Sequence, residues 1–183
     1  MRWFSDSDFL RGKVPMTKYE LRVLICSLLG VGPGKTLLDI GSGTGSITCQ
    51  WAEMGADVWA IESQRDAYDL TLENLERLGL TAQVIHGMAP QDLPRLAMDG
   101  CFLGGSRGQM AEIFPYLEEN LRPRGIFCGA FITLKNLEIC RRELQKWGYE
   151  QMETRLIQVS MENEIGLMIA QNPIFLVRGV KRG

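Results

Sequence analysis

Three glycines at alternate positions, Gly41, Gly43 and Gly45, follow the apolar run 36–38 and constrain the fold more than any other feature. Glycine has no Cβ, so a chain can turn sharply out of a strand here and bring its backbone close to a ligand. A second apolar run at 58–61 ends in Glu62, about where nucleotide-binding folds carry the acid that grips a ribose. The segment 36–62 therefore predicts a strand, a glycine turn, a helix and a second strand that ends in a carboxylate.

The rest of the chain alternates between helix and strand patterns. Thr17 and Glu20 predict a capping box before apolar residues that recur at helical spacing over 21–29 and stop at Gly30. This alternation predicts an α/β fold, with a mostly parallel seven-stranded sheet and an antiparallel C-terminal hairpin at one edge. The expected strands are 36–40, 57–62, 83–86, 100–103, 125–132, 151–160 and 167–177, and further helices are expected at 45–54, 65–79, 109–121 and around 137–147.

Composition limits the class of protein. A chain of 183 residues with 45% hydrophobic content predicts one domain over 1–183, in which 1–18 form an N-terminal arm. The N-terminus is too charged for a signal peptide, and no apolar run approaches the roughly 18 residues of a membrane span. We expect a soluble, cytoplasmic protein with no membrane partner. The 5 cysteines contain no C-x-x-C pair, so we expect buried free thiols and no metal site.

Charge is distributed unevenly along the chain. Residues 1–35 carry a net charge of +3, against −5 for the remainder and −2 for the whole chain. A nucleic-acid partner usually demands a broad basic face, so we expect none here. A small polyanionic ligand, held by a few guanidinium and ammonium groups, is compatible with this distribution.

The candidate site lies in the loops that follow the first four strands, because ligands of such sheets bind at the carboxyl ends of the strands. These loops are 41–46, 62–64, 87–90 and 104–108. Glu62 is expected to accept hydrogen bonds from both hydroxyls of a ribose, the alternative being a solvated acid at a strand end. The run Gly104, Gly105 and Arg107 is a second candidate, the alternative being an ordinary flexible loop. His86 is interpreted as a polar strand end and not as a catalytic base.

The pattern D-x-G-x-G-x-G, which begins at Asp39, resembles motif I of class I methyltransferases. These enzymes bind S-adenosylmethionine in a Rossmann-like fold. Ser46 stands where a dinucleotide-binding turn usually has its last glycine, which favours S-adenosylmethionine over a nicotinamide or flavin nucleotide, the open alternative. Asp39 would repel a pyrophosphate but can attract the cationic end of S-adenosylmethionine.

The N-terminal run 8–22, with its R-G-K-V-P-M-T-K string, resembles the opening of the CbiT family, the decarboxylating precorrin methyltransferases of cobalamin biosynthesis. The resemblance continues in order through 39–46, 102–106 and 172–177, so it spans nearly the whole chain. The arm string is specific, whereas motif I is shared by very many methyltransferases. The C-terminal half of CobL, a longer relative, is similar too. The chain could therefore stand alone or work with a carbon 5 methyltransferase, CbiE-like, as partner or fused domain.

This resemblance implies methylation of carbon 15 of precorrin-6B, with or without cobalt, and loss of carbon dioxide from the ring C acetate. No acid or base is assigned to catalysis, because the tetrapyrrole can serve as its own electron sink. A homotetramer is also implied. Substrate contacts are expected at Arg11, Lys13, Gly104, Gly105 and Arg107, and cofactor contacts at Thr17, Asp39, Gly41, Gly43, Gly45, Glu62, Met88 and Ala89.

The sequence departs from the family pattern at Met88, where relatives commonly carry an acid that receives the adenine amino group. Backbone atoms of Met88 and Ala89 would then have to serve. Two rival functions stay open. A class I methyltransferase acting on another small molecule would have no reason for the arm string, and a non-catalytic precorrin-binding subunit of a partner methyltransferase would bind tetrapyrrole without turnover.

Overall fold

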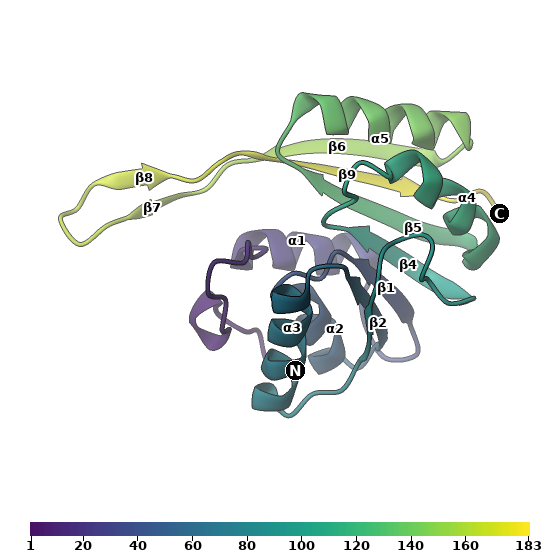
Figure 1. Cartoon of the computed structure of the whole chain (residues 1–183). Coiled ribbons are helices and arrows are strands. Elements are labelled where there is room, and N and C mark those ends of the chain that lie inside the picture. Colours follow the sequence, from purple (N-terminus) through teal and green to yellow (C-terminus); the bar gives the residue numbers. More distant parts are fainter.

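The computed structural model describes all residues 1–183 and contains a seven-stranded sheet in the order β3-β2-β1-β4-β5-β9-β6 (Figure 1). Neighbouring strands from β3 to β5 run parallel, and β9 runs antiparallel to both β5 and β6. The strand order reverses between β1 and β4, which is where ligands of open α/β sheets bind. The strands are β1 (Thr36–Ile40), β2 (Asp57–Glu62), β3 (Gln83–His86), β4 (Met98–Leu103), β5 (Leu121–Phe131), β6 (Glu150–Ile157) and β9 (Ile174–Val180).

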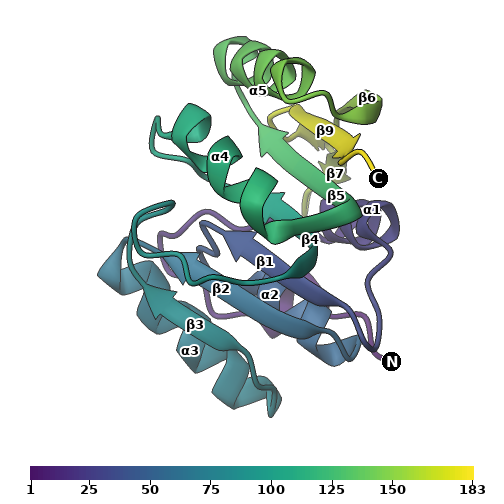
Figure 2. The same cartoon turned by 90° about the vertical axis from the view of Figure 1, so that its right-hand side faces the viewer.

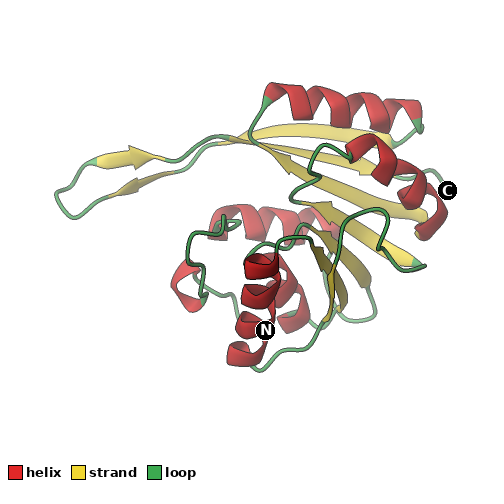
Figure 3. Cartoon of the chain, in the orientation of Figure 1, coloured by secondary structure: helices red, strands yellow, loops and turns green.

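Helices cover both faces of the sheet, as Figures 2 and 3 show. One face carries α1 (Tyr19–Leu29), α2 (Ser46–Glu53) and α3 (Arg65–Leu78), and the other carries α4 (Met110–Asn120) and α5 (Leu134–Lys146). Successive side chains of a strand point to opposite faces, so β1 contributes side chains to the helix layers on both faces of the sheet. Leu38 and Ile40 pack with α4, whereas Leu37 packs with α1 and α2. No helix here combines the length and the apolar character needed to cross a membrane.

The predicted elements before residue 150 are present, with changes at their ends. The strands predicted at 36–40, 57–62 and 83–86 coincide with β1, β2 and β3, whereas β4 and β5 begin earlier than predicted. The predicted capping box is wrong. Lys18 is the N-cap of α1 and makes no side-chain cap, and Thr17 lies one residue too early. The Thr17 carbonyl instead accepts a hydrogen bond from the buried Arg22 guanidinium at 2.7 Å.

The C-terminal hairpin differs from the prediction in the continuity of its strands. Each predicted long strand is broken, and the outer pieces, β7 (Ser160–Glu162) and β8 (Met168–Ala170), pair as a separate ribbon, residues 160–170, that projects from the body (Figure 1). The predicted hairpin does lie at one edge of the sheet, where β9 is placed between β5 and β6 and pairs antiparallel with both. Burial explains this order: β9 buries Leu176 and Val177, whereas β6 is largely exposed and carries charged residues suited to an edge.

The arm, residues 1–18, is packed against α1, α2 and α3. Phe4 and Phe9 are buried together with Cys49 and Leu75, and their rings meet edge to face at 5.8 Å. Arg22 of α1 is fully buried beneath the arm and donates to the carbonyls of Phe4 and Thr17, each at 2.7 Å. The arm is therefore held by apolar packing of Phe4 and Phe9 and by the hydrogen bonds of Arg22.

Candidate functional site

The glycine turn, residues 41–45, has the conformation that its sequence predicts. Gly41 and Gly43 have φ angles of 78° and 59°, which residues with a Cβ rarely adopt. A Cβ at Gly41 would lie 2.9 Å from the backbone nitrogen of Gly105, and one at Gly43 would lie 3.2 Å from the carbonyl oxygen of Pro15. The lack of side chains therefore lets the loop after β4 and the arm both approach the turn closely.

Glu62 ends β2 beside this turn. Its two carboxylate oxygens accept the backbone N–H groups of Gly43 at 3.0 Å and of Gln64 at 2.9 Å. The residue is 7% exposed, lies at the wall of a cavity and forms no salt bridge. A carboxylate offers about four acceptor sites, so Glu62 can accept further hydrogen bonds from hydroxyl groups of a ligand.

A cavity of about 610 Å³ lies at the carboxyl ends of the strands, between the arm, the glycine turn, the loop after β4 and the base of the ribbon. This volume is in the range of sites for small ligands and cofactors. Most of the residues proposed from the sequence are brought together here. The predicted residues that line it are Arg11, Thr17, Gly41, Gly43, Glu62, Gly104, Gly105 and Arg107.

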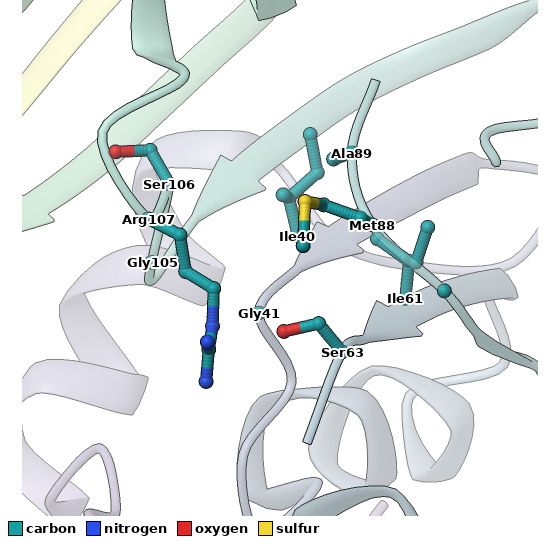
Figure 4. A pocket seen from close by; sticks show the side chains of 10 residues that line it. Ile40, Gly41, Ile61, Ser63, Met88, Ala89, Gly105, Ser106 and Arg107 are labelled. Carbon is teal, nitrogen blue, oxygen red and sulfur yellow. The ribbon is translucent and has the colours of Figure 1, made fainter. Parts of the chain in front are cut away.

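A smaller hollow of about 30 Å³ adjoins the cavity and shares Gly41, Gly105 and Arg107 with it. Met88 and Ala89, two of the residues predicted to contact the cofactor, line this hollow. Figure 4 shows Met88 and Arg107 on opposite sides of Gly41. Arg107 has a left-handed backbone with φ 47° and forms no salt bridge, so its guanidinium remains free to contact a ligand.

Three predicted site residues do not line either space. Lys13 lies exposed on the arm, and Gly45 packs against Thr71 of α3, where a Cβ would approach Thr71 Cγ2 to 2.9 Å. Asp39 is 1% exposed and accepts a hydrogen bond from Thr48 Oγ1 at 2.7 Å. Burial raises the pKa of Asp39 to about 7, an effect that the Thr48 hydrogen bond opposes and the nearby Glu62 carboxylate reinforces. The direct contact predicted between Asp39 and a cationic ligand has no geometric support, because its side chain lies behind the turn.

Part of the cavity wall was not predicted from the sequence. Ile157, at the end of β6, lines it together with Val159, Gln171 and Asn172, which lie in the segments that connect the ribbon to β6 and β9. Their contribution depends on where the two long strands break. The second break is marked by the turn signal Asn172-Pro173, which the predicted strand 167–177 did not take into account. Ile132, which follows β5, also lines the cavity.

The titratable side chains that line the cavity are three cations and two acids: Arg11, Lys18, Arg107, Glu20 and Glu62. No histidine, cysteine or tyrosine is among the lining residues. His86 lies outside, stacked on Tyr68 with ring centroids 5.1 Å apart. The 5 cysteines are free and buried, as predicted, and burial raises the pKa of Cys26, Cys49 and Cys128 to about 12. The site is therefore suited to binding an anionic ligand, and its lining holds no histidine to act as a base for a serine or threonine nucleophile.

Comparison with known proteins gives consistent results. The sequence matches the family described as precorrin methyltransferase domain over residues 8–179. It is 36% identical over 188 residues to a probable cobalt-precorrin-6B C(15)-methyltransferase (decarboxylating) of Sulfurisphaera tokodaii, covering 96% of each chain. It is 32% identical to the cobalt-precorrin-6B C(15)-methyltransferase (decarboxylating) of Salmonella typhimurium, covering 94% of this chain and 93% of the relative.

Among solved structures, the precorrin-6y C5,15-methyltransferase of Geobacter metallireducens superposes with a TM-score of 0.90, over 98% of this chain and 97% of that chain. Its sequence identity is 24%, so this likeness concerns the fold. The predicted α/β methyltransferase fold, with its seven-stranded sheet and antiparallel C-terminal pairing, is confirmed.

Proposed function

Because the chain belongs to the precorrin methyltransferase family, we propose that it methylates carbon 15 of cobalt-precorrin-6B, with decarboxylation of the ring C acetate, in cobalamin biosynthesis. One observation connects the family's reaction to the cavity of this chain. The arm, whose sequence is specific to this family, and the glycine turn, which many methyltransferases share, wall the same cavity. A methyltransferase for an unrelated small molecule would have no reason to place this arm there.

The residues present fit S-adenosylmethionine. Glu62 keeps acceptor capacity toward the cavity and would receive the ribose hydroxyls, and Gly41 and Gly43 line the same cavity. Backbone atoms of Met88 and Ala89 would contact the adenine, since Met88 has no acceptor for its amino group. When bound, S-adenosylmethionine supplies an electrophilic methyl group on a positively charged sulfur.

Cationic side chains of the same cavity would hold the substrate. Arg11 of the arm and Arg107 of the loop after β4 would pair with peripheral carboxylates of the tetrapyrrole, and guanidinium groups suit carboxylates because they can bind them in a bidentate manner. Gly104 and Gly105 allow the macrocycle to lie close to the backbone. Lys13, exposed on the arm, would act only at the cavity entrance.

Positioning accounts for most of the catalysis that this site would perform. Holding the attacking carbon and the methyl group within about 3.5 Å in line can lower the barrier by several kcal/mol without an acid or base. Decarboxylation can use the tetrapyrrole as its electron sink, so the chain's task is to hold one acetate and exclude water. This agrees with a cavity that lacks histidine, cysteine and tyrosine.

We also propose a homotetramer assembled through the ribbon. Its side chains Met161, Ile165, Leu167, Met168 and Ile169 are between 48% and 83% exposed, which is typical of surfaces that another chain covers. A carbon 5 methyltransferase, separate or fused, is the proposed functional partner, since the fold also matches a precorrin-6y C5,15-methyltransferase.

Mass spectrometry tests the reaction directly. The purified chain is incubated with S-adenosylmethionine and cobalt-precorrin-6B, or with the metal-free compound, and the tetrapyrrole mass is measured. Gain of one methyl group with loss of one carbon dioxide is the expected result, and the preferred substrate identifies the metal state. Binding without any change of mass would instead favour a non-catalytic carrier, and no binding would overturn the proposal.

A further inference from the structure

The arm and the glycine turn are distant in sequence but touch at the cavity wall. Val14 Cγ1 would lie 3.8 Å from a Cβ at Gly43, and Ser46 Oγ, at the start of α2, donates to the Thr17 carbonyl at 3.3 Å. Under the proposed function, Arg11 of the arm contacts the tetrapyrrole and the turn contacts the cofactor. A side chain that bonds to both segments could link the two binding events.

Asn74 of α3 is that side chain. Its Oδ1 accepts the backbone N–H of Leu10 at 2.8 Å, and its Nδ2 donates to the Leu10 carbonyl at 2.8 Å and to the Thr44 carbonyl at 2.8 Å. One fully buried amide group therefore joins the arm to the turn. A buried backbone group that loses its partner is costly, so neither segment can move away without disrupting these bonds.

Asn74 lies behind the cavity wall and not in it. It does not line the cavity, and neither do its partners Leu10 and Thr44, whereas the next residue on the arm, Arg11, does. The position of Leu10 thus fixes where the arm enters the cavity. One turn earlier on α3, Thr71 Oγ1 donates to the Gly43 carbonyl at 3.1 Å but makes no hydrogen bond to the arm.

We propose that Asn74 is a positioning residue that couples the two ligand sites. Binding of the cofactor at the glycine turn fixes the arm and so strengthens tetrapyrrole binding, and binding of the tetrapyrrole strengthens cofactor binding in the same way. This inference rests on the proposed function. Coupling between two sites is reciprocal, so one factor describes both directions, and such factors are typically about 5- to 150-fold. We expect a factor of about tenfold in the natural chain.

Isothermal titration calorimetry measures that factor. The dissociation constant of cobalt-precorrin-6B is determined with and without S-adenosylhomocysteine, which has no methyl group to transfer. Asn74→Ala should reduce the ratio of the two constants to about one. A folded variant, checked by circular dichroism, that keeps the natural ratio would overturn the proposal, as would a natural chain with a ratio of one.

Two control variants distinguish a loss of coupling between the sites from a general loss of order in the arm or the turn. Thr71→Val removes a hydrogen bond to the turn alone, and Gln50→Leu removes hydrogen bonds to the arm at Arg2 and Phe4 alone. Each should weaken one ligand but retain the coupling ratio, and loss of the ratio in both controls would refute a specific role for Asn74. If the natural chain binds S-adenosylhomocysteine but no tetrapyrrole, the proposed function fails and the inference falls with it.

A measurement on the natural chain covers the case in which Asn74→Ala does not fold. The Leu10 amide is bonded to Asn74 outside the cavity, so its hydrogen exchange reports the bridge and not direct ligand contact. Adding S-adenosylhomocysteine alone should slow exchange of the Leu10 amide about tenfold. An unchanged exchange rate there would overturn the proposed coupling.

Discussion

Glu62 contributes to both the local fold and the proposed cofactor contact. Glu62→Gln removes the negative charge and keeps one oxygen, which can accept from Gly43 or Gln64 but not from both, so circular dichroism must first confirm that the variant is folded. Hydrogen bonds to a charged group are worth about 1.5–3 kcal/mol, and we expect affinity for S-adenosylhomocysteine to fall by roughly 10- to 100-fold in titration calorimetry. Glu73→Gln, an exposed position on α3, is the matched control. Equal affinities for the two variants would exclude Glu62 from the cofactor site.

Arg11 and Arg107 line the cavity from opposite segments, and neither forms a salt bridge within the chain. Arg11→Ala and Arg107→Ala should each raise KM for the tetrapyrrole about tenfold, since each would remove a charge-assisted hydrogen bond to a substrate carboxylate. The KM for S-adenosylmethionine should change much less. Arg141→Ala, on the exposed side of α5, serves as the control. If both variants keep the natural KM, these residues do not bind the substrate.

The raised pKa of Asp39 predicts that the unfolding free energy of the chain depends on pH. Its pKa in the folded chain is raised to about 7 from an ordinary value of 3.8. The folded state therefore holds a proton that the unfolded state releases between these values, so this group's stabilising contribution is complete below the lower value and is lost as pH rises through about 7. Asn does not titrate, so the stability of Asp39→Asn relative to the natural chain should rise by about 2–3 kcal/mol between pH 5 and 8. Urea unfolding at several pH values measures the difference, and parallel stability curves would contradict a raised pKa.

The sequence indicates site residues well where backbone geometry demands them and less well where only side-chain direction matters. Gly41, Gly43 and Glu62 follow from the turn that a parallel strand needs, and all three line the cavity. Asp39 shares their motif, but strand alternation points its side chain toward α2 and Thr48. The motif alone does not distinguish that orientation from one toward the ligand.

Among the elements, the arm depends on one buried cation. Arg22→Met removes hydrogen bonds to Phe4 and Thr17 and the 2.9 Å ion pair with Asp6, and we expect unfolding free energy to fall by about 2–4 kcal/mol. Release of the arm should also accelerate tryptic cleavage at Arg11 and Lys13. Arg2→Met, an exposed partner of Asp8, should change stability by less than about 1 kcal/mol. Similar cleavage rates in both variants would show that Arg22 does not hold the arm.

Element prediction succeeds from α1 to α5, where the apolar period is local, and fails in the C-terminal region, where each predicted long strand is broken. The elements from α1 to α5 carry a local apolar period, and α1 and α3 also end at a stop signal, Gly30 and Gly79. The position of β9 between β5 and β6 depends on long-range pairing, which local periodicity does not encode. The Arg22 contacts are also invisible in the sequence, because a basic residue in an amphipathic helix is usually exposed.

At the scale of the whole molecule, the cavity is a product of topology. The arm, the turn after β1, the loop after β4 and the base of the ribbon come from four distant parts of the chain and meet at the switch in strand order. The ribbon itself contributes no buried residue, because β7 and β8 are exposed throughout. Its exposed apolar side chains therefore call for a role outside the monomer fold.

Replacing residues 160–170 by Asn-Gly tests that role. The ends can be joined by a short turn, because the Gln171 N–H donates to the Val159 carbonyl at 2.8 Å, and both of these residues line the cavity and stay in place. Since no buried side chain is lost, unfolding free energy per chain should change by less than about 1 kcal/mol. Light scattering coupled to size-exclusion chromatography should report a monomer for the shortened chain and a tetramer for the natural one. Glu164→Gln at the ribbon tip should leave the tetramer unchanged, and a shortened chain that still assembles would place the interface on another surface.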